Sequence, residues 1–141
     1  MKRFVLAVIA VFVAWSAMDY VIHGVFLKSL YEATAELWRP EDEMKSLMWL
    51  MYIVTAVVSV AFACLYCLLV SPKSVIAGVK YGLLFGIATG FPMGFGTYCY
   101  TPLPLPLAWI WFIGALLKAT VAGVIVGAII KCAGAKTEGA S

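Results

Sequence analysis

The sequence predicts an all-α, polytopic membrane protein with four transmembrane helices, and three observations lead to this fold class. Hydrophobic residues make up 65% of the 141 residues and charged residues 12%, whereas a soluble domain has roughly 45–50% and about 25%. Four apolar stretches each reach the roughly 20 residues that a helix needs to cross a bilayer. No stretch alternates with the period of two that is typical of a membrane barrel. This composition excludes a soluble enzyme, a disordered chain and a nucleic-acid-binding protein.

The first predicted span covers residues 4–27 and is interrupted only by Asp19 and His23. Its basic start and apolar run resemble a signal peptide, with a possible cleavage site that would remove residues 1–16. The apolar run continues well beyond that point, which signal peptides rarely do. The pattern therefore favours an uncleaved membrane anchor.

The loop after the first span predicts an outer helical hairpin over residues 28–46. Apolar residues repeat at intervals of three and four on one side of its first half, which indicates an amphipathic helix; they are Leu27, Leu30, Tyr31, Thr34, Leu37 and Trp38. Arg39 precedes a proline and should end this helix. Pro40 and the acidic residues after it suit the start of a second helix that enters the membrane at about Leu47. The hairpin is interpreted as a solvated cap or as a docking surface for an external partner.

The remaining spans are predicted at 47–70, 75–97 and 106–130. Lys80 is interpreted as an anchor whose side chain bends towards the interface. Pro92 should kink the third span, or end its regular part, near Ala88. Alternating prolines before the fourth span predict a rigid, extended link. Residues 1–131 then form a single domain, followed by a flexible cytoplasmic tail at 132–141.

Basic residues predict the orientation of the spans, because they favour cytoplasmic loops. They lie before the first span, around the loop between the second and third, and after the fourth: Lys2, Arg3, Lys73, Lys80, Lys131 and Lys136. Both termini are therefore predicted to be cytoplasmic. Aromatic residues gather at the opposite ends, as an interfacial belt would: Trp38, Trp49, Tyr98, Tyr100, Trp109 and Trp111.

Small residues form two stripes that predict close helix packing. In the third span a glycine recurs every four residues, at Gly78, Gly82, Gly86, Gly90 and Gly94. The fourth span has Ala115, Ala119, Gly123 and Gly127. Membrane helices gain stability from close backbone contact, which such glycine stripes permit. The two spans are expected to pack against each other within one bundle; the alternative is a self-associating face that builds a homo-oligomer.

Asp19 and His23 are the first candidate functional residues, with Ser16 and Tyr20 beside them. They lie four residues apart and share one helix face. An ionisable residue inside a span is costly and is a functional candidate by default. A carboxylate beside an imidazole can orient it, relay a proton or help to bind a metal. The alternative is a satisfied polar pair near the outer interface, and one pair is too few for a closed metal site.

Lys118 is the second candidate, because it lies near the middle of the fourth span. With a rise of about 1.5 Å per residue, Asp19 and Lys118 lie at nearly the same depth. The sequence therefore predicts an ion pair between them if the first and fourth spans are neighbours. The alternative is a lysine that reaches water through a polar pocket.

The cysteines are weaker candidates. Cys64 and Cys67 form a CxxC pair, a spacing that suggests redox or metal chemistry in soluble proteins. Within a span near the reducing side they are interpreted as small packing residues. Cys99 stands alone in an outer loop, and Cys132 is a possible lipidation site after the fourth span. No metal site or cofactor is predicted.

The segment from Asp19 to Met44 carries a resemblance to a known family. Its pattern is Asp-x3-His-Gly-x2-Leu-x3-Tyr-x2-Thr-Ala-x-Leu-Trp-Arg-Pro-x3-Met. Together with the first third of the chain it resembles a family of small bacterial inner-membrane proteins with no assigned activity. The resemblance implies a bacterial inner (cytoplasmic) membrane location and no functional residues.

Three functions follow as hypotheses. The first is a structural or accessory subunit of a larger membrane complex, or a small oligomer, without a catalytic site. The second is a small proton-coupled transporter or channel that uses Asp19, His23 and Lys118. The third is thiol redox or metal handling through Cys64 and Cys67. The expected partners are the lipid bilayer and other membrane polypeptides, and no nucleic acid.

Overall fold

Helices form every regular element of residues 1–130, the part of the chain that the computed structural model describes. In chain order they are α1 (Lys2–Asp19), the π-helix η1 (Tyr20–Phe26), α2 (Lys28–Glu32), the 3-10 helix η2 (Ala35–Leu37), α3 (Glu41–Ser46), α4 (Met48–Leu69), α5 (Val75–Phe91), the π-helix η3 (Pro92–Gly96), α6 (Thr97–Tyr100) and α7 (Leu105–Ile129). Lys131 and the predicted tail at 132–141, with Cys132 and Lys136, lie outside the described residues.

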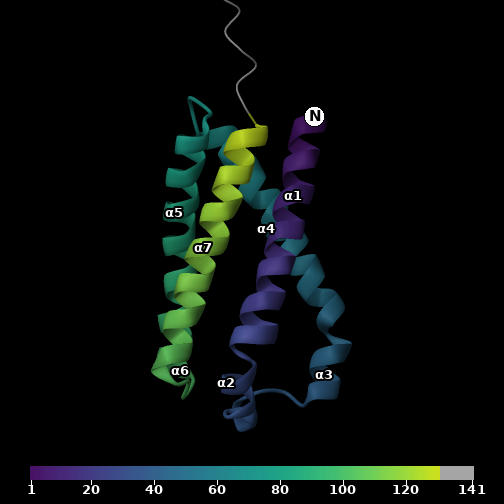
Figure 1. Cartoon of the computed structure of the whole chain (residues 1–141), viewed down its shortest axis with the longest axis vertical. Helices are drawn as coiled ribbons and strands as arrows, with labels where there is room; N and C mark the ends of the chain where they lie inside the picture. The colour runs from purple at the N-terminus through teal and green to yellow at the C-terminus, as the bar shows by residue number, and fades with distance from the viewer. Residues whose placement is uncertain (131–141) are drawn as a thin grey trace, which may run out of the picture.

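Four of these helical stretches are long and apolar enough to cross a membrane. They are Lys2–Phe26, Met48–Leu69, Val75–Tyr100 and Leu105–Ile129. The predicted all-α fold with four such spans is therefore confirmed, and the chain is a multi-pass membrane protein by the length and composition of its helices. The start of α1 and the end of α7 lie at one end of the bundle, whereas α2, α3 and α6 lie at the other, which we call the cap end (Figure 1).

The segment between the first two spans is more broken than the sequence predicts. α2 ends after five residues, and a turn separates it from η2. The Thr34 hydroxyl donates to the Leu30 carbonyl oxygen at 2.8 Å and accepts from Trp38 Nε1 at 3.0 Å. Such local bonds compete with regular helix. A second break at Leu47 separates α3 from α4, so the helix that begins after Pro40 does not run straight into the span.

The third span also differs from the sequence prediction, because α5 stays regular as far as Phe91 instead of ending near Ala88. At Pro92 the chain changes to the π-helix η3. Proline lacks an N–H group, and its ring clashes with the carbonyl of the residue four positions earlier. The wider π turn relieves that clash locally, so the span continues to Tyr100.

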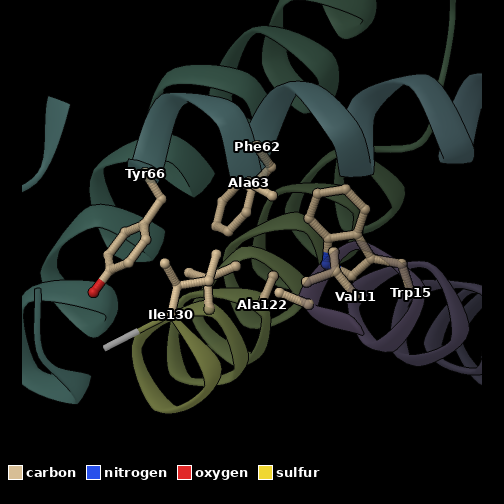
Figure 2. Close-up of a cluster of buried hydrophobic side chains, with 9 residues drawn as sticks. Val11, Trp15, Phe62, Ala63, Tyr66, Ala122 and Ile130 are labelled. Atoms are coloured by element: carbon tan, nitrogen blue, oxygen red, sulfur yellow. The ribbon is translucent and has the colours of Figure 1, made fainter. Parts of the chain in front are cut away.

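Three spans supply the larger hydrophobic core, at the end of the bundle away from the cap. α1 contributes Ala7, Val11 and Trp15, α4 contributes Phe62, Ala63 and Tyr66, and α7 contributes Ala122, Val126 and Ile130. Figure 2 shows their side chains meeting between the three helices. The rings of Tyr81 and Phe85 on α5 pack against Phe62, with centroids 4.6 and 4.9 Å away. α4 is thus held mainly through its second half.

A smaller core lies at the cap end. Leu27, Leu103 and Leu107 are buried there, and the side chains of residues 30, 31, 37 and 38 pack around them. The side chains that the amphipathic pattern predicts to face inward are buried or half-buried. We call residues 27–38 the cap, because α2 and η2 fold over the cap-end parts of α1 and α7.

α5 and α7 approach each other along small residues. A Cβ built on Gly78 would lie 2.1 Å from the Gly123 carbonyl oxygen, and one on Gly82 would lie 2.3 Å from that of Ala119. At the far end, a Cβ on Gly94 would lie 2.4 Å from the Ala108 carbonyl oxygen. Gly86 and Gly90 face Leu116 and Ala115 in the same way, and Gly127 faces Ser74. These distances leave no room for a side chain at the contact.

Tyr81 provides a polar contact between α4 and α5, because its hydroxyl donates to the Phe62 carbonyl oxygen at 2.9 Å. Tyr81→Phe keeps the ring and removes this bond, so we expect it to lower the free energy of unfolding by about 1 kcal/mol. The exposed Tyr52 on α4 supplies the control Tyr52→Phe. Denaturant unfolding in mixed micelles measures both. Equal stabilities would show that the bond contributes nothing.

Candidate functional site

Three ionisable residues, Asp19, His23 and Lys118, lie close together where the first and fourth spans meet. Lys118 Nζ on α7 donates to Asp19 Oδ1 at the end of α1, forming an ion pair between the first and fourth spans. The two side chains are 23% and 30% exposed, and the ammonium lies 5.9 Å from the centre of the Trp15 ring. A charged group in the hydrocarbon region is costly unless it is paired. The ion pair therefore reduces the free-energy cost of placing both the Asp19 carboxylate and the Lys118 ammonium inside the spans.

His23 continues this arrangement towards the cap. Its Nε2 lies 3.8 Å from Asp19 Oδ1, and its Nδ1 lies 2.7 Å from the Tyr31 hydroxyl oxygen. The two rings are stacked, with centroids 6.0 Å apart. The same hydroxyl oxygen accepts from Trp111 Nε1 on α7 at 2.8 Å. Hydrogen bonds and charge contacts thus extend from Lys118 in the middle of α7 to Tyr31 on the cap. We call these five residues the polar chain: Lys118, Asp19, His23, Tyr31 and Trp111.

The helix period explains why the residues of the polar chain on the first and fourth spans face each other. Asp19 and His23 are four residues apart across the junction of α1 with η1. Trp111 and Lys118 are seven residues apart, two turns along one face of α7. The π turn of η1 widens the helix at the polar residues, a feature that is frequent at functional sites. Trp15 Nε1 also donates to the Lys118 carbonyl oxygen at 2.8 Å, which fixes α1 against α7 beside the ion pair.

Tyr31 keeps its proton at neutral pH. Burial raises the pKa of its hydroxyl above the ordinary value of 10.0, although the hydrogen bond from Trp111 acts in the opposite direction. A neutral phenol has a hydrogen to donate as well as oxygen lone pairs to accept. Tyr31 can therefore accept from Trp111 and donate to His23 at the same time.

Two of the four candidate residues in the first span stay outside the polar chain. The Ser16 hydroxyl oxygen is buried without a hydrogen-bond partner among the described residues. Tyr20 is 73% exposed and packs near Gly24. Position in the chain predicts both to lie beside the pair, but neither makes a polar contact with Asp19 or His23 among the described residues.

Three residues of the site were not predicted from the sequence: Trp15, Tyr31 and Trp111. The amphipathic pattern places Tyr31 on the inner face of the cap, and the position of Trp111 near a span end predicts a residue of the interfacial belt. Their spacing in the sequence could have indicated a shared helix face, since Tyr31 follows His23 by eight residues and Trp111 precedes Lys118 by seven. That spacing could not show that the cap folds back over the span.

The cysteines do not gather into a site in the part of the chain that is described. Cys64 and Cys67 are half-buried on α4, Cys99 is exposed, and all three are free. Within residues 1–130 there is no group of three or more His, Cys, Asp or Glu side chains that could hold a metal ion. Thiol chemistry at Cys64 and Cys67 stays a prediction.

The charges near the cap end pair locally, with residues four positions away. Lys45 Nζ lies 2.8 Å from Glu41, and Arg39 lies 3.3 Å from Glu43. The Lys45 hydrogen bond and charge hold the pKa of Glu41 below its ordinary value of 4.5. Exposed pairs of this kind contribute little stability. They join residues of the same short segment and do not attach α3 to the other helices.

The geometry of the polar chain is the basis on which a function can be argued. The resemblance carried by residues 19–44 stays a prediction. Comparisons with protein-family models, with curated proteins and with solved structures found no match for this chain.

Proposed function

We propose that this chain is a structural or accessory subunit of a membrane complex, located in a bacterial inner membrane with both termini in the cytoplasm. The observation that carries the proposal is the mutual pairing of three ionisable groups where the first and fourth spans meet. Asp19, His23 and Lys118 each have a partner within the chain. Groups paired in this way fix helices in place, whereas a transport pathway needs groups that are open to a substrate.

The exposed part of α3 and α4 supports the same proposal. All residues from 39 to 54 are exposed, and α3 with the first half of α4 stands apart from the other helices (Figure 1). Large apolar side chains there, such as Met51 and Tyr52, are 56% and 55% exposed. A subunit that joins other polypeptides presents such a helix to them within the bilayer.

The mass of the protein purified in nanodiscs tests this proposal. We expect the 15.3 kDa chain to purify with a second polypeptide in fixed stoichiometry. A photo-reactive residue at Met51 should then attach to that polypeptide, whereas one at Leu84, which is 69% exposed on α5, should attach to lipid. A lone monomer would overturn the proposal, and a homo-oligomer would favour the second candidate.

The second candidate is a small proton-coupled transporter or channel. The observation that favours it is the proximity of three groups that can carry a proton, Asp19, His23 and Tyr31: His23 Nδ1 lies 2.7 Å from the Tyr31 hydroxyl and Nε2 lies 3.8 Å from Asp19. Proton flux into liposomes tests it, with Asp19→Asn as the variant and Tyr20→Phe as its matched control. Flux that is lost in Asp19→Asn and unchanged in Tyr20→Phe would establish transport. Absence of flux in the unchanged protein would exclude it.

A further inference from the structure

The contacts of the polar chain favour one protonation state of His23. Trp111 Nε1 is a donor only, and it points its hydrogen at the Tyr31 oxygen, 2.8 Å away. The Tyr31 hydrogen stays available for His23 Nδ1, at 2.7 Å. In a neutral imidazole with its proton on Nε2, Nδ1 accepts that hydrogen and carries no proton of its own.

The other ring nitrogen agrees with this assignment. His23 Nε2 faces Asp19 Oδ1 at 3.8 Å, and a carboxylate favours the N–H form of the nitrogen that faces it. The charged and titratable groups around His23 are Asp19 on α1, Tyr31 on α2 and Lys118 on α7. Asp19 and Lys118 neutralise each other, so a neutral imidazole leaves the site with no net charge.

We infer that His23 is a proton-binding site supplied from the cap end of the bundle, with the Tyr31 hydroxyl as its relay. A proton from water reaches the Tyr31 oxygen as the Tyr31 hydrogen passes to His23 Nδ1. The phenol is restored, His23 becomes an imidazolium, and the net charge of Asp19, His23 and Lys118 changes from zero to plus one. Only O–H and N–H bonds form and break, and acid in the surrounding water supplies the proton.

Protonation of His23 has a defined consequence at the ion pair. Asp19 then faces two cations, the imidazolium and the Lys118 ammonium, instead of one. The imidazolium also becomes a donor at Nδ1, so the Tyr31 hydrogen must turn away from it. Binding of one proton therefore changes both the Asp19–Lys118 contact between α1 and α7 and the hydrogen bond from Tyr31 on the cap. Proton binding at His23 does not depend on whether the chain transports protons or joins a complex.

The sequence makes the test direct, because His23 is the only histidine in the chain. Protein labelled with ¹⁵N at histidine and placed in nanodiscs gives one pair of imidazole signals, and their chemical shifts report which nitrogen carries the proton. We expect the Nε2–H form at neutral pH in the unchanged protein. The Nδ1–H form would overturn the inference without any substitution being made.

Two variants then test the relay. Tyr31→Phe keeps the ring that stacks on His23 and removes the hydroxyl, and Tyr20→Phe makes the same change at an exposed tyrosine of η1. General acid–base groups contribute about 100-fold or more to proton transfer, so we expect Tyr31→Phe to slow proton exchange between His23 and water at least about tenfold. Tyr20→Phe should match the unchanged protein. Equal exchange rates in the two variants would overturn the relay.

Discussion

Gly78→Val is expected to destabilise the bundle strongly by forcing α5 and α7 apart. A Cβ at Gly78 would lie 2.1 Å from the Gly123 carbonyl oxygen, and that neighbour is backbone, which cannot turn aside as a side chain can. The two helices would have to separate along their whole contact. Overpacking typically costs 1–3 kcal/mol and sometimes more, and we expect a loss of about 3 kcal/mol in the free energy of unfolding.

Gly96→Ala is the matched control, because Gly96 continues the same span in η3. The nearest atom to a Cβ at Gly96 is Pro92 Cβ at 3.9 Å, an ordinary contact. This variant should stay within about 0.5 kcal/mol of the unchanged protein. Unfolding by SDS in mixed micelles, followed by circular dichroism, measures both. If Gly78→Val proved as stable as Gly96→Ala, the close contact of α5 with α7 would be wrong.

The ion pair between Asp19 and Lys118 leads to the second large effect. We expect replacement of one partner to lower the free energy of unfolding more than replacement of both. Lys118→Met leaves a carboxylate without its cation inside the span. Breaking a fully buried pair costs about 3–5 kcal/mol, and we expect a part of that loss for this half-buried pair. Asp19→Asn leaves the ammonium unpaired in the same way. The double variant removes both charges, so we expect it to be more stable than either single variant.

A double-mutant cycle in mixed micelles measures this coupling. Lys80→Met, at an exposed lysine on α5, controls for the loss of a positive charge elsewhere in a span, and it should change the stability little. Strictly additive losses from Asp19→Asn and Lys118→Met would show that the two charges do not stabilise each other. A double variant that is less stable than both single variants, but by less than the sum of their losses, would show a coupling too weak to offset the two lost charges.

Much of this architecture could be predicted because bilayers impose simple requirements on a sequence. Apolar length predicted the four spans within a few residues, and the matching depths of Asp19 and Lys118 pointed to their pairing. Glycine spacing identified the residues that now lie between α5 and α7. Each of these patterns can be measured along single helices, as the length of an apolar run, the depth of a residue or the spacing of glycines.

The features that could not be predicted depend on contacts between distant segments. The helix is interrupted at Leu27, between η1 and α2, and Tyr31 on α2 lies against His23 on η1. The hydroxyl of Thr34 bonds within its own turn, where α2 has ended. The π-helices that begin at Tyr20 and Pro92 rotate the residues after them relative to a regular α-helix, and the spacing of apolar residues does not predict this rotation. Tyr31 and Trp111 therefore looked like surface aromatics, although together they complete the polar chain.

The separation of Asp19 and Lys118 along the chain has a consequence for biogenesis. The two residues are 99 positions apart, in the first and fourth spans, so the ribosome releases Asp19 long before its counterion exists. α1 enters the bilayer with a carboxylate that must stay protonated, remain near water or be shielded by another protein. α5 and α7 follow each other directly and can associate as a hairpin at once. When α7 enters the bilayer, Lys118 pairs with Asp19 and fixes α1 against α7. Synthesis of α7 is then the step that completes assembly of the four spans.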